Sequence, residues 1–418
     1  MLFDAVLFDL DGTLVATDRF WAPAARTGCR RAFRELGLER EPPGADAWMS
    51  IVGSPLTEGL ARLFPDLDPA ALAVVERECM AEEHRQLDAG GAAPMPGAVA
   101  LLSEIRAAGL SIGIASNCSA AYLEHMLGPA LELGPLVHEA RCLDSPGIGN
   151  KADMIADLLR TFGTRSAVFV GDRVTDRDAA WENGLPHVHC RFGFAAAGEP
   201  TAAEASIEDL GELTRVLRRR RAWLEQVFER AGVLRDLAAA AHPIAVGLTG
   251  PPASGKTLFA RDAARVFDGH GIPAAAVGLE RFRRAAGEPE DVLSPFDLAR
   301  LEAEVLAPLE RGELPADGVD AAADVLLLEG PGLLDPRLRG RLKRVLYLDL
   351  ADELQLRRAA AQVPPGGDPK GLLELHRHGL PAHRALAERY PPAEHADLIL
   401  DGSNPLGPVG LDPGPTGG

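Results

Sequence analysis

Short apolar runs alternate with amphipathic segments of helical length along most of this 418-residue chain. The apolar runs have the length of buried strands, and they lie at residues 5–8, 111–115, 167–170, 244–248, 324–328, 344–348 and 398–400. Helical patterns lie between them, for example at residues 98–108, 152–162 and 257–267. Because this alternation is typical of parallel sheets with helices on both faces, we expect an α/β fold.

The length of the chain predicts more than one domain, since a domain takes about 150 residues on average. We expect two doubly wound parallel-sheet domains, at residues 1–215 and 243–402. Within the first domain, residues 16–95 interrupt the alternation because they are mostly helical with proline-rich joints. This interruption predicts an inserted helical cap.

Two other segments stand apart in composition. Residues 216–242 are rich in Ala, Leu and Arg, and they predict a solvated linker helix between the domains. The arginine run at 218–221 within this helix leaves phosphate binding as the alternative. Residues 403–418 consist largely of Gly and Pro and predict a disordered tail.

The charge of the chain argues against a nucleic acid or an anionic membrane as partner. The formal net charge is −18, and both halves are acidic, whereas such partners require a basic surface. No apolar run approaches the roughly 20 residues of a membrane helix. Met1 leads directly into the first apolar run, so a cytoplasmic location is expected. The five cysteines are scattered without a CxxC pair, which favours reduced thiols over a zinc site.

Two acids follow the first apolar run, in the sequence FDLDGT at residues 8–13. Ligands of open α/β sheets bind beyond the carboxyl ends of the strands, so Asp9 and Asp11 lie where chemistry usually takes place. A spacing of two places both side chains on one face of an extended chain. Two carboxylates in one site repel each other, and Mg²⁺, which prefers oxygen ligands, would offset their charge. The alternative is a surface turn with two solvated acids.

Three later features point to the same site. The strand at 111–115 leads into Ser116, which offers a hydroxyl donor at a strand end. Lys151 lies directly ahead of a predicted helix. Another strand leads into Asp172, and Asp176 follows four residues later.

In order and spacing, these motifs resemble the four signature motifs of the haloacid dehalogenase superfamily. The resemblance covers roughly residues 1–215. Within that superfamily the chain looks like the capped phosphoglycolate phosphatases, because IVGSPL at residues 51–56 resembles their substrate-specificity loop. The resemblance implies a Rossmann-like core that removes phosphate from a small phosphorylated metabolite.

The resemblance also implies a role for each acid. Asp9 would attack phosphorus and form an aspartyl-phosphate, which divides one difficult step into two. Asp11 would protonate the leaving oxygen and then deprotonate the attacking water. Mg²⁺ would be bound by the carboxylates of Asp9 and Asp172 and by a backbone carbonyl at Asp11, with Asp176 in support.

Ser116 and Lys151 would hold the phosphoryl oxygens, whose negative charge needs stabilisation during transfer. Only four of the 43 cationic residues are lysines, namely Lys151, Lys256, Lys343 and Lys370. A lysine that persists in such a chain is therefore worth examining, and at Lys151 a compact ammonium group would reach the nucleophile and the phosphate together. Two of the four lie in sequence motifs: Lys151 in those described above, and Lys256 in the one that follows.

A second motif follows the apolar run at 244–248. Residues 250–257 read GPPASGKT, a complete GxxxxGK[ST] loop between a strand and a helix. Such a loop binds phosphates through its backbone N–H groups, here at Gly250, Ser254 and Gly255. Lys256 would reach the β- and γ-phosphates of ATP, and Thr257 would bind Mg²⁺.

The remainder of this domain resembles the uridine kinase and phosphoribulokinase group of P-loop kinases. The run DVLLLEG at 324–330 resembles their second phosphate-side strand, which would place Glu329 near the metal. The family's acceptor-orienting Asp is replaced by Glu280, which we expect to act as the base. The stretch 359–367 lacks the arginines of the family's lid, leaving Arg357, Arg358 and Lys370 to cover the triphosphate.

Three functions fit these observations. The first is a bifunctional enzyme, in which the phosphatase serves a small metabolite and an ATP-dependent kinase phosphorylates a hydroxyl. The second is a polynucleotide kinase-phosphatase, which joins the same two types of unit, although the cap and the acidity argue against it. The third is a phosphatase regulated by a nucleotide-binding module without catalytic activity. The sequence identifies neither substrate.

Overall fold

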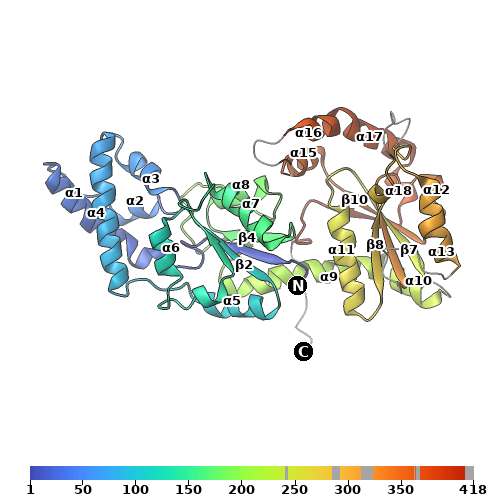
Figure 1. Cartoon of the computed structure of the whole chain (residues 1–418), viewed down its shortest axis with the longest axis horizontal. Coiled ribbons are helices and arrows are strands. Elements are labelled where there is room, and N and C mark those ends of the chain that lie inside the picture. The colour runs from blue at the N-terminus through green and yellow to red at the C-terminus, as the bar shows by residue number, and fades with distance from the viewer. Residues whose placement is uncertain (241–242, 285–291, 312–322, 362, 364–367, 410–418) are drawn as a thin grey trace. The chain divides into compact units, whose positions relative to one another are not determined.

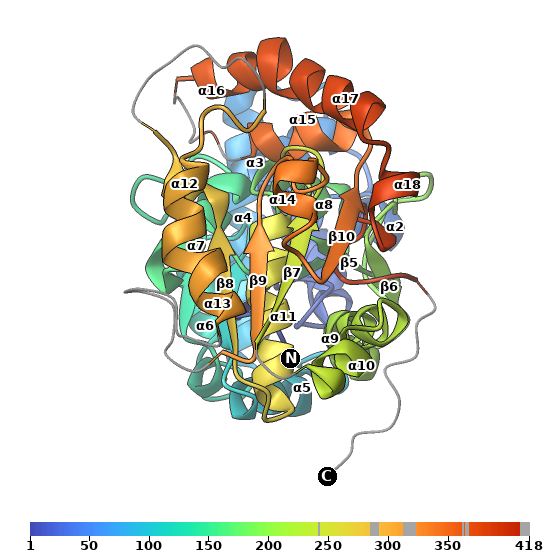
Figure 2. The same ribbon diagram turned by 90° about the vertical axis from the view of Figure 1, so that its right-hand side faces the viewer.

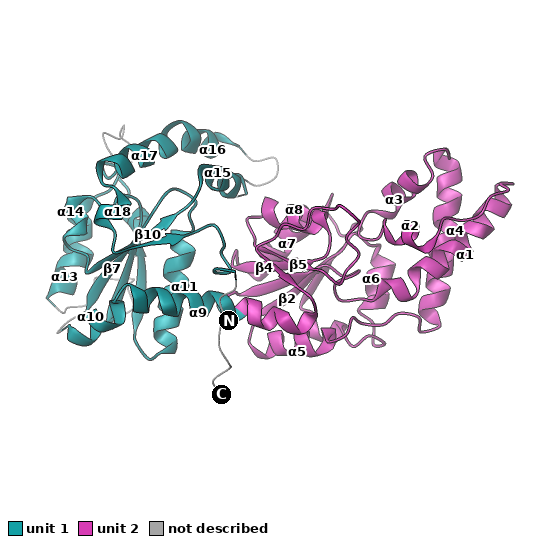
Figure 3. Cartoon of the chain, turned by 180° about the vertical axis from the view of Figure 1, so that it is seen from behind, with its two compact units in different colours: residues 1–2, 218–418 teal, residues 3–217 magenta. Residues whose placement is uncertain are grey.

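The structure is a computed structural model of the chain, and it describes residues 1–240, 243–284, 292–311, 323–361, 363 and 368–409 (Figure 1). The chain divides into two compact units (Figure 3). Residues 3–217 form the N-terminal unit, and residues 1–2 with 218–418 form the C-terminal unit. Among the described residues, no helix combines the length and the apolar character needed to cross a membrane.

A parallel sheet forms the core of the N-terminal unit. Within residues 3–217, all of which the structure describes, its six strands have the order β3-β2-β1-β4-β5-β6. The strands are β1 (Ala5–Phe8), β2 (Ser111–Ala115), β3 (Glu139–Arg141), β4 (Ala167–Gly171), β5 (His187–Cys190) and β6 (Ala205–Ile207). This is the doubly wound order, in which the winding reverses at β1. A ligand site is therefore expected beyond the carboxyl ends of β1 and its neighbours β2 and β4.

Helices cover both faces of this sheet because its central strands are apolar on both faces. Ala5 and Leu7 of β1 join the apolar cluster beneath α7 and α8, whereas Val6 and Phe8 point to the other face and are equally buried. The helices of this layered core are α5 (Ala98–Ala107), α6 (Ala120–Met126), α7 (Lys151–Phe162) and α8 (Val174–Glu182). Short 3₁₀ turns lie at η2 (Gly134–Leu136) and η3 (Leu210–Glu212).

A helical segment lies between β1 and α5, and we refer to it as the cap. It consists of η1 (Thr17–Arg19), α1 (Trp21–Glu35), α2 (Ala45–Met49), α3 (Leu56–Leu63) and α4 (Pro69–Asp88). Asp68 caps α4 by accepting a hydrogen bond from the backbone N–H of Ala71 at 2.8 Å. Helices α1 and α4 approach closely at Gly28, where a Cβ atom would lie 2.5 Å from the carbonyl oxygen of Glu78.

The segment at 216–242 is not a solvated linker. It forms most of α9 (Leu213–Arg230) and all of α10 (Val233–Ala239), and residues 241–242 lie outside the described part of the chain. The apolar residues of α9 are buried in the core of the C-terminal unit, and they include Trp223, Leu224, Val227 and Phe228. The prediction was wrong because the arginine run dominates the composition, whereas burial follows the apolar stripe at helical spacing.

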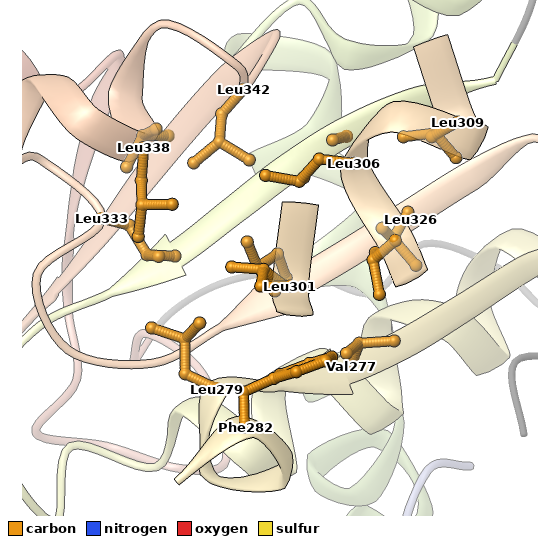
Figure 4. Packing of buried hydrophobic residues seen from close by; sticks show 14 of the residues in the cluster. Val277, Leu279, Phe282, Leu301, Leu306, Leu309, Leu326, Leu333, Leu338 and Leu342 are labelled. Carbon is orange, nitrogen blue, oxygen red and sulfur yellow. The ribbon is translucent and has the colours of Figure 1, made fainter. Parts of the chain in front are cut away.

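The C-terminal unit is built on a second parallel sheet. In its described part, five strands have the order β11-β10-β7-β9-β8. They are β7 (Ile244–Thr249), β8 (Ala274–Gly278), β9 (Val325–Glu329), β10 (Arg344–Asp349) and β11 (Leu398–Asp401). Alternate residues of these strands face different clusters: Val246 and Leu327 lie with α9 and α11, whereas Leu326 and Leu328 belong to the other cluster. Figure 4 shows Leu326 in this second cluster with residues such as Leu301 and Leu306.

Helices surround this second sheet, and three of them lie together at one of its ends. They are α11 (Lys256–Gly269), η4 (Leu279–Phe282), α12 (Leu298–Leu301), η5 (Glu302–Leu306), α13 (Ala307–Glu310), α14 (Pro336–Arg339), α15 (Asp352–Ala360), α16 (Lys370–Glu374), η6 (Leu375–Gly379), α17 (Leu380–Arg389) and α18 (Pro392–His395). Both views place α15, α16 and α17 together at one end of the strands (Figures 1 and 2).

The residues after β11 are ordered at first, contrary to the prediction of a disordered tail from residue 403. Leu406 is completely buried, and Arg220 donates a hydrogen bond to the carbonyl oxygen of Pro405 at 2.6 Å. Composition alone missed these contacts, because a Gly- and Pro-rich segment can still be held by neighbours far away in sequence. Residues 410–418 lie outside the described part of the chain.

Candidate active site

Four predicted acids and one lysine meet beyond the carboxyl ends of β1 and β4. Asp9 and Asp11 follow β1, Asp172 follows β4, and Asp176 lies in the first turn of α8. Asp9, Asp172 and Asp176 are buried, and each offers an oxygen within 4.8 Å of the others. Lys151, at the start of α7, donates hydrogen bonds to Asp9 at 2.7 Å and to Asp176 at 2.6 Å. Parallel strands bring these distant residues together because their carboxyl ends share one edge of the sheet.

The acidic triad fits a divalent cation. The Oδ2 atom of Asp9 and the Oδ1 atom of Asp172 are buried without a hydrogen-bond partner among the described residues. A buried oxygen without a partner is costly, and a cation bound by both carboxylates would remove that cost. A set of carboxylate oxygens is the ligand environment that Mg²⁺ prefers.

Burial dominates the electrostatics of the triad. It raises the pKa of Asp9 and of Asp172 above the usual carboxyl range, and for Asp9 the ammonium of Lys151 opposes the rise. Burial alone would lower the pKa of Lys151, but Asp176 and Asp9 raise it above its ordinary value. Lys151 is therefore a fixed cation, which partly neutralises the carboxylates around it.

Asp11 is oriented by two hydroxyl groups that the sequence did not single out. Thr17 and Tyr122 both donate to its Oδ1 atom, at 2.6 and 2.5 Å. The turn after Asp11 requires glycine: Gly12 has φ +82°, and a Cβ atom there would lie 2.5 Å from an oxygen of Asp172. This turn lets the β1 acids and Asp172 approach each other.

The end of β2 and the residue after Asp172 connect the core to the cap. Ser116 is buried at the end of β2, and the next residue, Asn117, donates its amide to the carbonyl oxygen of Gly53 at 3.0 Å. Arg173 donates to the carbonyl oxygen of Val52 and forms an ion pair with Glu199 at 3.1 Å. Val52 and Gly53 belong to the loop at residues 51–56, which was expected to set specificity, so this loop is attached to the edge of the sheet that carries the acids.

The predicted phosphate loop lies between β7 and α11. The ammonium of Lys256 donates to the carbonyl oxygens of Pro251 at 2.7 Å and Gly250 at 3.2 Å, and it lies 3.4 Å from the hydroxyl of Ser254. Gly250 has φ +147°, and a Cβ atom there would lie 2.2 Å from the carbonyl oxygen of Leu348. Gly255 precedes α11 in the left-handed conformation. The loop therefore depends on glycine at both ends.

Two polar residues accompany this loop. Thr257 donates to Glu329 at 3.0 Å, which connects the start of α11 to the end of β9. Burial raises the pKa of Glu329. Burial lowers the pKa of Lys256 to about 8. The pair of Thr257 and Glu329 can supply the oxygen ligands for a cation that accompanies bound phosphates.

Glu280 and two of the cations expected to cover the triphosphate, Arg358 and Lys370, bind partners within the unit. Glu280 is exposed on η4, and Arg283 holds both of its carboxylate oxygens, at 2.6 and 2.7 Å. Arg358 donates to the carbonyl oxygens of residues 402 and 403. Lys370 is exposed and forms an ion pair with Asp368 at 3.0 Å.

Glu83 on α4 is a further functional candidate that sequence reasoning did not single out. It is 9% exposed, and burial, together with the charge of Asp11, raises its pKa to about 8. The available signal was a glutamate within the apolar stripe of a cap helix, where it continues a series of residues at steps of four that also contains Val75, Cys79 and Leu87. Recognising it required knowing which side of α4 is buried.

Comparison with known proteins supports the assignment of the N-terminal unit. The family of haloacid dehalogenase-like hydrolases matches residues 3–184, which lie within that unit. The N-terminal half of the chain is therefore a haloacid dehalogenase-like hydrolase domain.

Similar solved structures each cover about half of this chain. A haloacid dehalogenase-like hydrolase from Streptococcus pneumoniae is 22% identical (TM-score 0.43; 51% of this chain, 97% of that one). A predicted phosphoglycolate phosphatase from Haemophilus somnus is 19% identical (TM-score 0.45; 52% and 98%). CbbY from Rhodobacter sphaeroides, in complex with phosphate, is 21% identical (TM-score 0.43; 50% and 96%).

A curated protein also matches part of the chain. The cell division cycle protein 48 homolog of Archaeoglobus fulgidus is 30% identical over 229 residues. The match covers 47% of this chain and 28% of that protein, so the chain spans less than a third of the length of this relative.

Proposed function

We propose that the N-terminal unit hydrolyses small phosphate monoesters through a phosphorylated Asp9, in the manner of the phosphoglycolate phosphatases that it resembles. The observation that carries the proposal is the position of Lys151, which donates to Asp9 and Asp176 beside an Asp9 oxygen that has no partner in the described part of the chain. Lys151 fixes the Asp9 side chain by donating to its Oδ1 atom, which orients the carboxylate for attack on phosphorus.

The reaction takes place in two steps. Asp9 attacks phosphorus, the bond to the leaving oxygen breaks, and Asp11 gives that oxygen its proton. Water then attacks the aspartyl-phosphate while Asp11 takes up a proton, which releases inorganic phosphate and restores Asp9. Thr17 and Tyr122 hold Asp11 in place during both transfers. Ser116 and Lys151 bind the phosphoryl oxygens.

Asp9, Asp172 and Asp176, together with the backbone carbonyl of residue 11, would hold Mg²⁺. The cation would supply charge neutralisation for the phosphoryl group and the carboxylates around it.

The test is phosphate release from a panel of phosphorylated metabolites in the presence of Mg²⁺, for the wild type and Asp9→Asn. We expect the wild type to release phosphate and the variant to lose at least about a thousandfold in rate. A radiolabelled aspartyl-phosphate, trapped by rapid acid quench from the wild type alone, would identify the intermediate. Release by Asp9→Asn at the wild-type rate would refute the proposal.

We propose, in addition, that the C-terminal unit binds a nucleoside triphosphate at residues 250–257 and transfers its terminal phosphate to a small acceptor. The strand–loop–helix arrangement around Lys256 supports this proposal, as does the bond between Thr257 and Glu329. Glu280 would act as the base on the acceptor once Arg283 releases it.

A specific observation favours a second candidate, a nucleotide-binding module that regulates the phosphatase without transferring phosphate. Arg283 holds Glu280, and backbone carbonyls after β11 hold Arg358. Comparing Mg-ATP binding with ATP turnover separates the two candidates, because the module binds without turnover. A polynucleotide substrate remains the least favoured, and tight, salt-dependent binding of a single-stranded oligonucleotide would revive it.

A further inference from the structure

Arg173 connects three segments of the N-terminal unit that are far apart in the sequence. It directly follows Asp172 of the acidic triad, and it is buried. Its Nε atom donates to the carboxylate of Glu199, which lies beyond β5, at 3.1 and 3.3 Å. Its terminal nitrogens face the cap: Nη1 donates to the backbone carbonyl oxygen of Val52, and Nη2 lies 3.5 Å from that of Ser50. One side chain thus holds the core and the cap together.

The guanidinium is oriented by contacts that the core makes alone. The side chains of Arg173 and Glu199 are only 9% and 7% exposed, so water hardly reaches their ion pair. Glu199 is itself fixed, because it accepts hydrogen bonds from the backbone N–H groups of Val174 and, at 3.0 Å, Ala196. A planar guanidinium that a carboxylate holds along one edge presents its remaining N–H groups in a set direction. Arg173 is therefore a preoriented donor for the cap.

The cap meets this donor with the backbone of the specificity loop, by which we mean residues 51–56. Besides the bond from Arg173 to Val52, the amide of Asn117, beyond β2, donates to the carbonyl oxygen of Gly53 at 3.0 Å. Gly53 has φ +86°, and a Cβ atom there would lie 2.9 Å from Cγ of Arg173. The loop therefore also packs against the stem of Arg173, and this close approach requires glycine.

Both anchors of the specificity loop adjoin residues of the candidate site. Arg173 follows Asp172, and Asn117 follows Ser116. The loop is thus held at the edge of the sheet where the phosphoryl group would bind. Its two bound carbonyl oxygens could accept hydrogen bonds from water instead, so the contact can open without leaving a backbone group unpaired. Such a contact suits a cap that admits a substrate and then excludes water.

We propose that Arg173 is a positioning residue of the phosphatase, which holds the specificity loop closed over the acids while the ester is bound. This inference rests on the proposed phosphatase function. It makes the choice between esters depend on where the loop is held, and it assigns to Glu199 the orientation of Arg173. An ester whose leaving group gains nothing from the loop should not need this contact.

Hydrogen exchange measures the closed position of the loop without any substrate. The backbone N–H groups of Val52 and Ser54 are bonded to carbonyl oxygens three residues earlier, so they exchange when this turn opens. Arg173→Met removes the donors but keeps the aliphatic stem, and Glu199 keeps its two backbone N–H partners. Because a charged hydrogen bond to the loop is lost, exchange at these two positions should become about tenfold to a hundredfold faster. Peptides from β1 and β4 should keep their wild-type rates.

Kinetics tests whether the position of the loop sets specificity. The reference is p-nitrophenyl phosphate, whose activated leaving group needs little from the cap, and the comparison is the metabolite ester that the wild type hydrolyses fastest in the panel described above. With Mg²⁺, Arg173→Met should lower the ratio of kcat/KM for the metabolite to kcat/KM for p-nitrophenyl phosphate by at least about tenfold. Arg173→Lys keeps the charge but offers a single nitrogen, so it should recover only part of this ratio. Glu199→Gln, which leaves Arg173 without its ion partner, should lower the ratio by a smaller factor.

Arg177→Met is the matched control, because Arg177 lies one turn further along and its partners Asp178 and Trp181 are on its own helix, α8. It should keep the wild-type exchange and the wild-type ratio. If Arg173→Met and Glu199→Gln both keep the wild-type exchange or the wild-type ratio, the positioning role is wrong. It is also wrong if exchange accelerates throughout the unit, since loss of stability would then explain the kinetics. If the wild type hydrolyses none of these esters, the proposed phosphatase function fails instead, whereas hydrogen exchange still reports on the attachment of the loop.

Discussion

The guanidinium of Arg220 on α9 lies 2.5 Å from the carboxylate of Asp262 on α11, and the two side chains are only 4% and 1% exposed. Removing one partner of a buried ion pair leaves the other charge uncompensated. We expect Asp262→Ala to lower the free energy of unfolding of the C-terminal unit by about 3–5 kcal/mol. Hydrogen-exchange mass spectrometry of peptides from both helices would measure the loss.

Glu225→Ala is the control for this prediction. Glu225 also binds an arginine of α9, Arg221, at 2.9 Å, but both side chains are 37% exposed. An exposed pair of this kind contributes about 0.3–0.5 kcal/mol. Equal losses for the two variants would show that the pair of Arg220 and Asp262 does not stabilise the unit beyond an ordinary surface contact.

Mg²⁺ should stabilise the N-terminal unit through its buried acids. A cation that binds only the folded state at a hundred times its Kd adds about 2.7 kcal/mol. We expect Asp176→Asn to abolish the increase in melting temperature on adding Mg²⁺, whatever it does to stability without the ion. Differential scanning calorimetry in EDTA and in excess Mg²⁺ measures both values.

Asp178→Asn tests whether this effect belongs to the triad. Asp178 lies on the same helix as Asp176, but its side chain is 52% exposed and binds Arg177. The Asp178→Asn variant should keep the full increase in melting temperature on adding Mg²⁺. If Asp176→Asn also keeps it, the triad is not the cation site.

His187 makes stability depend on pH. Both of its ring nitrogens are buried without a partner among the described residues, and burial lowers its pKa to about 3. The unfolded chain takes up this proton near pH 6.5, so below that pH it binds more protons than the folded chain. The contribution of His187 to the free energy of unfolding therefore falls by up to about 1.4 kcal/mol per unit as the pH drops from 6.5 toward 3.

His187→Phe should remove this dependence and raise stability by about 1–3 kcal/mol at neutral pH, because no buried ring nitrogen remains unpaired. Urea unfolding at pH 7.5 and 5.5 compares the variant with the wild type. The buried carboxylates, whose raised pKa values give the opposite slope, are common to both proteins and cancel in the difference. His84→Gln, on the exposed side of α4, should leave the slope unchanged. If the free energy of unfolding of His187→Phe changed with pH as much as that of the wild type, His187 would not be the source of this pH dependence.

Lys256→Met should weaken Mg-ATP binding by at least about tenfold, because the ammonium is the cation of the phosphate loop. Isothermal titration calorimetry measures the affinity. Lys343→Met is the control, since Lys343 is exposed and lies outside residues 250–257. Equal affinity in both variants would mean that nucleotide, if bound at all, lies elsewhere.

The sequence predicted those features that depend on neighbours close along the chain. Asp9 and Asp172 could be placed because each follows an apolar strand, and parallel strands end at one edge of a sheet. The loop at residues 250–257 could be placed for the same reason. The second parallel sheet was likewise predicted from its apolar runs.

Features set by packing between distant segments could not be predicted. The apolar stripe of α4 does not by itself show that Glu83 is buried, since its burial depends on the helices α1 and α3 that pack against α4. The arginine run on α9 predicted that this part of the helix is exposed to solvent, although Arg220 is buried against Asp262. Tyr122 bonds to a residue 111 positions earlier in the chain, a contact without a local signal.

Because the chain has only four lysines, an amine-reactive label has few side chains to modify. Lys151 is buried and its pKa is raised, so it presents no free amine to a reagent. Lys343 and Lys370 are exposed on the surface. The pKa of Lys256, lowered to about 8, leaves a sizeable neutral fraction near neutral pH. An acylating reagent used sparingly should therefore mark the phosphate loop ahead of the other lysine side chains, which provides a covalent handle without any engineered cysteine.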